Sequence, residues 1–259
     1  MADPLDTLIV NVDYTGACAG ACPTCVLSVE ERRESGPFLG AGAVTTALAD
    51  IAADSPPVTN FVLGLGRGNT LTLDPAVTDE IRTICRRAAD LFAFDHACLE
   101  LSTSLVGKID QQLDRAKHWV SLMREAGSPF DPRFVVVANP AQGSPKYWAN
   151  IDRFLTEMHE WRGDTDGAGD ILVLNLAVDA LPDLDWLERF LAGYKFPVNL
   201  TWTPAFDEAA TSREGLARLA DWLVGFYELA VRQGLDSNLV NRLADADAVA
   251  GVPPAALMG

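Results

Sequence analysis

Short apolar runs rich in β-branched residues alternate with longer segments of helical periodicity along most of the chain. The runs predict strands at residues 8–15, 60–66, 97–104, 133–140, 170–179 and 197–204. The segments between and after them predict helices at residues 40–53, 74–92, 108–127, 144–163, 182–194 and 211–233. Strict alternation of strand and helix favours parallel strands joined by right-handed crossovers. The sequence therefore predicts an α/β fold, a partial (βα)6 TIM-like barrel with parallel strands.

A single barrel accounts for nearly the whole length of the chain. The sequence has 259 residues, 49% of them hydrophobic, which is enough material for a sizeable core. No Pro/Gly/Ser-rich linker interrupts the alternation. We therefore expect a barrel core at residues 1–235 and a C-terminal helix and tail at residues 236–259.

The charge of the chain argues against two classes of partner. Its 36 Asp and Glu outnumber its 20 Lys and Arg, and the formal net charge is -16. Such a surface repels phosphate backbones and anionic lipid headgroups, so nucleic acid and membrane are not expected as partners. The N-terminus has no basic region followed by an apolar stretch, and no run approaches the length of a membrane helix. A cytoplasmic protein is the simplest expectation.

Polar residues gather on one face of the predicted strands, toward their carboxyl ends. Because successive side chains of a strand point to opposite faces, residues of the same parity share a face. The polar residues on that face are Asn11, Asp13, Thr15, Glu100, Ser102, Ser104, Asn139, Asn175, Asp179, Asn199, Thr201 and Thr203. They form either a structural layer that hydrogen-bonds to itself or the lining of a ligand cavity at the barrel top. The size of the set favours the cavity.

Three cysteines lie close together directly after the first predicted strand. Cys18, Cys22 and Cys25 form the pattern C-x3-C-x2-C within "TGACAGACPTC". Thiolates suit zinc, copper(I) or iron–sulfur centres. Structural zinc normally has four protein ligands, and His96 with Cys98 falls at the opposite, amino end of a predicted strand. A [4Fe–4S] cluster held by three cysteines leaves one iron open to a small molecule, which accounts for the missing fourth thiol.

With this motif and the six βα units over roughly residues 6–235, the chain resembles the radical S-adenosylmethionine (SAM) enzymes. The resemblance implies that Cys18, Cys22 and Cys25 hold a [4Fe–4S] cluster whose open iron binds SAM. In that family an electron from the cluster cleaves SAM to a 5′-deoxyadenosyl radical, which abstracts hydrogen from the substrate. It further implies an oxidoreductase with an electron donor such as flavodoxin or ferredoxin.

The resemblance also implies cofactor-binding residues. The family's Gly-Gly-Glu-Pro-like turn after the second strand corresponds to "LGLGRGNT", which places Gly66, Gly68 and Asn69 near the methionine end of SAM. Asn69 stands where the family has an acid, and Thr24 stands where it often has an aromatic residue near the adenine. Two polar residues that end later strands, Asn139 and Asn175, correspond to ribose or carboxylate contacts.

Two residues of the third strand complete the predicted cofactor site. Glu100 and Ser102 face the expected cavity, and a buried carboxylate such as Glu100 needs a cationic partner. An ammonium group of the cofactor or substrate would serve. No catalytic side chain is predicted.

The sequence leaves two functions open. The first is a radical SAM enzyme that acts on a small metabolite or a short peptide. The second is a non-catalytic iron–sulfur or zinc-binding barrel that has lost SAM turnover. This alternative stays open because Asn69 and Thr24 differ from the residues that the family has at these positions. The remaining cysteines, Cys85 and Cys98, are expected to be buried packing residues rather than redox groups.

Overall fold

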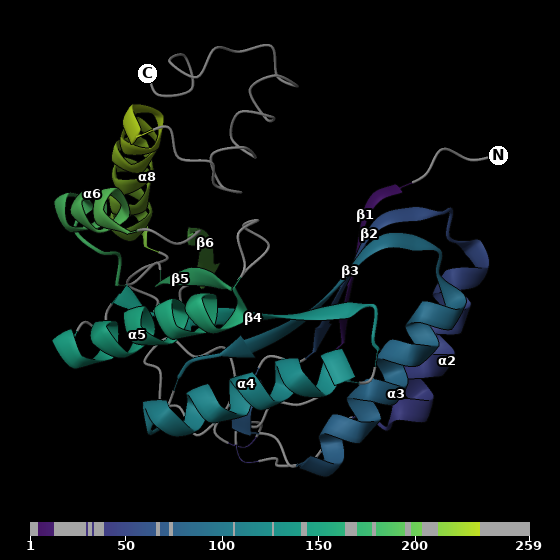
Figure 1. Ribbon diagram of the computed structural model, residues 1–259. Helices are drawn as coiled ribbons and strands as arrows, with labels where there is room; N and C mark the ends of the chain where they lie inside the picture. Colours follow the sequence, from purple (N-terminus) through teal and green to yellow (C-terminus); the bar gives the residue numbers. More distant parts are fainter. Residues whose placement is uncertain are drawn as a thin grey trace. The chain divides into compact units, whose positions relative to one another are not determined.

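The fold was determined as a computed structural model (Figure 1). It describes residues 5–12, 30, 33, 39–65, 68–72, 75–105, 107–125, 127–140, 144–163, 170–177, 180–194, 198–203 and 212–233. The elements are β1 (Leu5–Val12), α2 (Ala41–Asp54), β2 (Val58–Leu65), the 3-10 helix η1 (Thr70–Thr72), α3 (Pro75–Leu91), β3 (Phe94–Thr103), α4 (Ile109–Glu125), β4 (Phe130–Ala138), α5 (Pro145–Arg162), β5 (Ile171–Ala177), α6 (Leu184–Gly193), β6 (Val198–Thr203) and α8 (Arg213–Gln233).

The six strands form one sheet in the order β1-β2-β3-β4-β5-β6. The register is parallel between β1 and β2, β2 and β3, β3 and β4, and β5 and β6. Each strand and helix predicted within residues 8–233 has its counterpart. The C-terminal helix and tail predicted at residues 236–259 lie outside the described residues. The predicted fold class, a partial (βα)6 TIM-like barrel with parallel strands, is confirmed.

The described residues fall into two compact units. The first contains β1 to β3, β4 as far as Val136, and helices α2 to α5. The second contains residues 137–140, Ser144, β5, α6, β6 and α8.

Strands β2, β3 and β4 begin two or three residues earlier than the sequence predicted. The cause is an aromatic cluster at their amino ends, where Phe61 lies 4.8 Å from Phe92 and 5.7 Å from both Phe94 and Phe130, between ring centroids. Burying these rings stabilises the extended backbone upstream of the β-branched runs. Pro132 lies inside β4 although proline is a frequent strand boundary.

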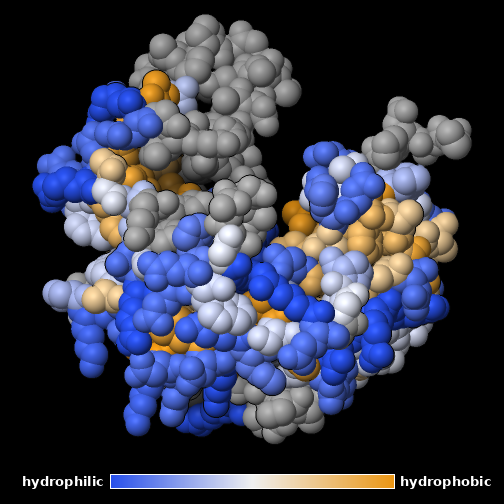
Figure 2. Space-filling view, in the orientation of Figure 1, coloured by the Kyte–Doolittle hydropathy of each residue, from blue (hydrophilic) through white to orange (hydrophobic). Residues whose placement is uncertain are grey.

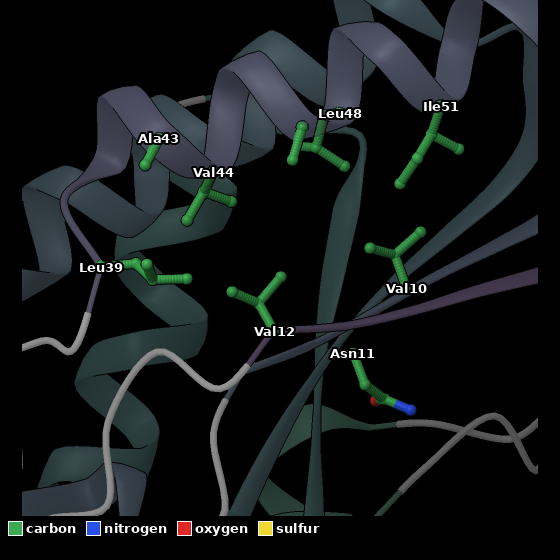
Figure 3. Close-up of a pocket in the computed structure, with 9 residues that line it drawn as sticks. Val10, Asn11, Val12, Leu39, Ala43, Val44, Leu48 and Ile51 are labelled. Carbon is green, nitrogen blue, oxygen red and sulfur yellow. The ribbon is translucent and has the colours of Figure 1, made fainter.

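Alternate residues of the strands in the first unit face the helices. Phe134 of β4 packs edge-on against Phe154 of α5, and its register neighbour Leu101 is fully buried. Figure 3 shows Val10 and Val12 of β1 pointing toward α2, with Asn11 pointing the other way. Residues of the opposite parity therefore lie on the sheet face that α2 and α5 do not cover.

A buried ion pair connects the end of α5 to the sheet. Arg162 Nη2 lies 2.8 Å from Asp170 Oδ1 and donates to the carbonyl of Pro132 at 2.6 Å. The same Asp170 oxygen accepts the backbone N–H of Phe134 at 2.8 Å. The two side chains are 1% and 4% exposed. The glycine that follows, Gly163, has φ 69°, as expected for the residue that ends a helix.

The second unit is closed by close contact between α6 and α8. Trp222 donates its indole N–H to the carbonyl of Pro182 at 2.8 Å. At Gly225 a Cβ atom would lie 2.5 Å from Leu184 Cδ1, so glycine allows α8 to approach α6. Asp183 caps the start of α6 by accepting the N–H of Trp186 at 3.0 Å.

Among the described helices, none combines the length and the apolar character that crossing a membrane requires.

Candidate functional site

The turn after β2 is held in place by β3. Gly68, Asn69 and Thr70 are buried there, and Thr70 Oγ1 donates to the carbonyl of Ser102 at 2.7 Å. The carbonyl oxygen of the Asn69 side chain accepts the Thr103 hydroxyl at 2.9 Å and the N–H of Leu71 at 3.3 Å. These bonds fix the backbone of the turn at the carboxyl end of β2.

Helix α4 supports the same turn from its other side. Arg115 donates to the carbonyl of Leu71 at 2.9 Å, and the Thr103 hydroxyl also accepts the N–H of Leu105 at 3.1 Å. Leu105 has φ 51°, an uncommon value for a residue with a side chain. Thr103 therefore connects β3 to the turn after β2, and Arg115 connects the same turn to α4.

The side-chain oxygen of Asn69 accepts hydrogen bonds from Leu71 and Thr103, which the sequence could not show. We expected this oxygen to replace the family's acid near the methionine ammonium, and it accepts two hydrogen bonds from the protein. The contribution of Asn69 to cofactor binding remains a prediction.

Four residues form a row across the uncovered face of the sheet. Asn11 pairs in register with Gly64, Gly64 with Glu100, and Glu100 with Arg133. Glu100 and Arg133 form an ion pair, so Arg133 supplies the cation that the Glu100 carboxylate needs. We call these four residues the polar row.

The ion pair of the polar row is partly open to solvent. The Arg133 and Glu100 side chains are 28% and 24% exposed. Arg133 Nε is buried and has no hydrogen-bond partner in the described part of the chain. Solvent does not reach this Nε atom, so any ligand contact would involve the exposed parts of the two side chains.

The two cysteines outside the motif differ in burial. Cys85 is 1% exposed and burial raises its pKa to about 12, which confirms its prediction as a packing residue. Cys98 is only half-buried and neighbours the polar row, so its prediction as a core residue is only partly met. Burial raises the pKa of Cys98 to about 11, although the charge of Arg133 lowers it. Both thiols are therefore protonated near neutral pH.

Five of the predicted site residues lie outside the described residues. They are the cluster ligands Cys18, Cys22 and Cys25, and the cofactor residues Thr24 and Gly66. Among the described residues, no group of three or more His, Cys, Asp or Glu could hold a metal ion. The cluster site therefore remains a prediction from the motif.

The other predicted residues are divided between the two units. Gly68, Asn69, Glu100 and Ser102 belong to the first unit, and Asn139 and Asn175 belong to the second. Asn139 is 4% exposed at the end of β4, and Asn175 is half-buried on β5. Within the first unit the structure brings Asn69 close to the end of β3, and it pairs Glu100 with Arg133.

Sequence reasoning missed three residues of this region, namely Thr103, Arg115 and Arg133. A signal existed only for Arg133, which has the same parity as Asn139 along the fourth predicted strand. The pairing of Arg133 with Glu100 depends on the register between β3 and β4, which the sequence does not give.

An apolar groove lies between β1 and α2 (Figure 3). Its volume is about 240 Å³, and Val12, Val44 and Leu48 are among its lining residues. Exposed Leu39 and Ile51 also line it, and Figure 2 shows apolar surface over α2. Asn11 is the polar side chain in its lining, so the groove itself is not suited to polar chemistry.

Comparison with known proteins identifies the fold. No protein-family profile matches the chain, and the curated proteins contain no sequence match. Among solved structures, native anSMEcpe with bound AdoMet matches with a TM-score of 0.59 and 9% identity, over 97% of this chain and 68% of that chain. The structure of anSMEcpe with AdoMet and the Kp18Cys peptide matches with a TM-score of 0.56 and 10% identity. The matched protein, anSMEcpe, is an anaerobic sulfatase-maturating enzyme of the radical SAM class. The chain therefore resembles a radical SAM enzyme in fold as well as in motif.

Proposed function

We propose that the protein is a radical SAM enzyme. It would use a three-cysteine [4Fe–4S] cluster to cleave SAM and abstract hydrogen from a small metabolite or a short peptide. The observation that carries this proposal is the position of C-x3-C-x2-C directly after β1 of a fold that matches AdoMet-bound structures over 97% of the chain.

The residues present suit the two groups. Three thiolates form a soft donor set that leaves one iron of a [4Fe–4S] cluster open, and Cys18, Cys22 and Cys25 would hold it. The turn at Gly66, Gly68 and Asn69 would offer backbone groups to the methionine end of SAM. When bound, the cluster would supply the electron for cleaving SAM.

The protein's own residues would bind and orient these groups. The Thr103 bonds keep the turn after β2 in one conformation. Asn139 and Asn175 would contact the ribose or carboxylate of SAM, Thr24 would offer its backbone near the adenine, and Ser102 would line the cavity. No described side chain is required to transfer a proton, so we assign no acid or base.

A second function is favoured by one observation. The Asn69 carbonyl oxygen is engaged within the protein, so the turn after β2 presents no acid-like acceptor from that side chain. A non-catalytic iron–sulfur or zinc-binding barrel that has lost SAM turnover would have this property.

Anaerobic reconstitution separates the two functions. The enzyme should bind iron and sulfide in the ratio of one [4Fe–4S] cluster and release 5′-deoxyadenosine from SAM on reduction. A colourless protein with stoichiometric zinc would exclude the first function, and a cluster without 5′-deoxyadenosine release would favour the second.

A pair of cysteine variants tests the ligand assignment. Cys22→Ala should lose both the cluster and SAM cleavage. Cys85→Ala is the matched control, because Cys85 is buried in α3 and lies outside the motif. Loss of the cluster in Cys85→Ala alone would show that the ligands are assigned wrongly.

The proposal has further parts that follow from the resemblance and the composition. We infer a cytoplasmic enzyme with an electron donor such as flavodoxin or ferredoxin, and with neither nucleic acid nor membrane as a partner. The catalytic core would comprise residues 1–235, followed by a helix and tail at residues 236–259.

A further inference from the structure

We propose that Glu100 and Arg133 bind an α-amino-acid group of the substrate, one that presents an ammonium and a carboxylate side by side. The inference rests on the proposed function and deepens it, because it names the chemical class of the substrate. Glu100 would receive the ammonium, and Arg133 would receive the carboxylate.

The arrangement of the two charges matches such a group. Glu100 and Arg133 are register partners on neighbouring parallel strands, which lie about 4.8 Å apart. Both side chains are partly exposed on the sheet face that α5 does not cover. A ligand complementary to a carboxylate beside a guanidinium carries the two opposite charges at similar spacing.

The rest of the polar row places a side-chain amide beside Glu100. Its neighbour on β2 is Gly64, and a Cβ atom there would lie 2.2 Å from the side-chain oxygen of Asn11. The Asn11 amide therefore lies over Gly64, which adds an uncharged donor and acceptor next to the charged pair. A small polar group of a ligand that contacts Glu100 from the β2 side would also contact the Asn11 amide.

Stability alone explains little of this ion pair. Partly exposed pairs typically stabilise a fold by about 0–1 kcal/mol, because solvent screens the charges and two side chains lose freedom. Binding of a charged group at the exposed parts of the two side chains gives the pair a further role.

The overall charge selects among possible ligands. At a formal net charge of -16 the protein repels a purely anionic ligand. An amino-acid group has no net charge, and its carboxylate can still reach Arg133.

The position of the pair favours the substrate over the methionine of SAM, which carries the same chemistry. Glu100 lies three residues before the end of β3 at Thr103, or about 10 Å along the strand. Arg133 lies further still from the end of β4. The predicted methionine-binding turn contacts the end of β3 through Asn69 and Thr103, so the methionine of SAM would bind nearer to that end than to Glu100.

The direct test observes Arg133 while an amino acid is added. The Arg133 Nε–H resonance of the reconstituted full chain should shift in a saturable way with L-alanine in the millimolar range. L-alanine methyl ester and N-acetyl-L-alanine each lack one charge, so each should bind at least about tenfold more weakly. No saturable shift, or equal shifts with all three compounds, would overturn the inference.

A charge exchange separates recognition from folding. Glu100→Arg combined with Arg133→Glu retains an ion pair, and it should keep the unfolding midpoint near the wild-type value while weakening L-alanine binding at least about tenfold. The matched control is Arg153→Glu combined with Glu157→Arg, an exposed pair on α5 that should leave L-alanine binding unchanged. Unchanged binding in the first double variant would show that the pair is only structural.

SAM serves as the second probe and identifies which molecule the pair holds. If SAM shifts the Arg133 resonance and prevents the shift by L-alanine, the pair holds the cofactor and the inference is wrong. Release of 5′-deoxyadenosine by the wild-type protein tests the proposed function separately. A flat L-alanine titration on a protein that releases 5′-deoxyadenosine therefore overturns only this inference.

Discussion

Two arginine–carboxylate pairs meet at neighbouring positions of β4 and differ in almost every contact. Arg162 and Asp170 are 1% and 4% exposed, and they bond to the backbone of Pro132 and Phe134. Arg133 lies between Pro132 and Phe134 in β4 and points to the opposite face of the sheet. It forms an ion pair with the partly exposed Glu100. The first pair holds the backbone of β4, and the second is partly exposed to solvent.

This difference shows how burial decides what an ion pair can do. A buried pair offsets the cost of leaving water only with further contacts, and here the backbone of β4 bonds to both Arg162 and Asp170. Their burial keeps a ligand from reaching them. The partly exposed pair contributes less to stability, and its side chains can be reached from solvent.

The largest effect is expected at the buried pair. Arg162→Met keeps much of the side-chain volume but leaves Asp170 buried without its cation, which should lower the free energy of unfolding by about 3–5 kcal/mol. Urea unfolding monitored by circular dichroism measures this loss. Arg162→Met with Asp170→Leu should remain destabilised, because Pro132 and Phe134 also lose backbone bonds. A wild-type midpoint in either variant would refute the structural role of the pair.

The next effect is expected at Thr103, which joins the turn to β3. Thr103→Val keeps the shape but loses the bonds to Asn69 and to the N–H of Leu105, and should cost about 1–3 kcal/mol of unfolding free energy. Thr83→Val is the control, because Thr83 is exposed on α3 and bonds only to a helix carbonyl. Equal losses in the two variants would contradict the role given to Thr103.

A smaller effect is expected at Gly64 in the polar row. Gly64→Ala places a Cβ atom against the Asn11 amide, and because Asn11 is exposed and can move, the cost should be about 1 kcal/mol. Adding Asn11→Ala should restore most of that loss in thermal unfolding. If the double variant is no more stable than Gly64→Ala, the Asn11 contact does not cause the effect.

The smallest effect is expected at the partly exposed pair itself. Glu100→Gln should change the unfolding free energy by less than about 1 kcal/mol, and it should lower the pKa of Cys98, which the Glu100 charge raises. Arg133→Met should raise that pKa instead. The pH dependence of Cys98 alkylation, followed by mass spectrometry, measures both shifts. Shifts in the same direction would show that the two charges do not act on Cys98 as a pair.

The Cys98 thiol should make the fold less stable as the pH rises. Burial raises the folded-state pKa of Cys98 to about 11, above its ordinary value of 9.0. The unfolded chain therefore loses this proton first, and the stabilisation is present below pH 9 and is lost as pH rises through 11. Cys98→Ala should flatten the stability profile in this interval, as urea unfolding at successive pH values would reveal. An unchanged slope would exclude Cys98 as its source.

Much of the fold could be predicted because its signals are local. The β-branched runs and helical periods located all six strands and their helices, and Gly127 and Gly163 marked helix ends, with φ values of 61° and 69°. The starts of β3 and β4 could not be predicted, because their extension depends on Phe94 and Phe130 packing with residues distant in the sequence.

The candidate site was less predictable because its contacts depend on register. The sequence identified Glu100 as a carboxylate in need of a cation, but the choice of Arg133 follows from how β3 lies against β4. Asn69 was selected as a ligand-facing residue, and its internal bonds to Leu71 and Thr103 appear only in three dimensions. The C-x3-C-x2-C motif can be read from the sequence alone, and its role as the cluster site stays a prediction because residues 13–29 lie outside the described residues.

The hydrogen bonds around Thr103 have an entropic consequence for any molecule that binds at the end of β2. A loop that becomes ordered only on binding reduces affinity by the conformational entropy that it loses. Here Asn69, Thr70 and Arg115 already restrain the turn in the free protein. A ligand therefore meets a preorganised surface, and its affinity there depends on the contacts it forms rather than on the ordering of the chain.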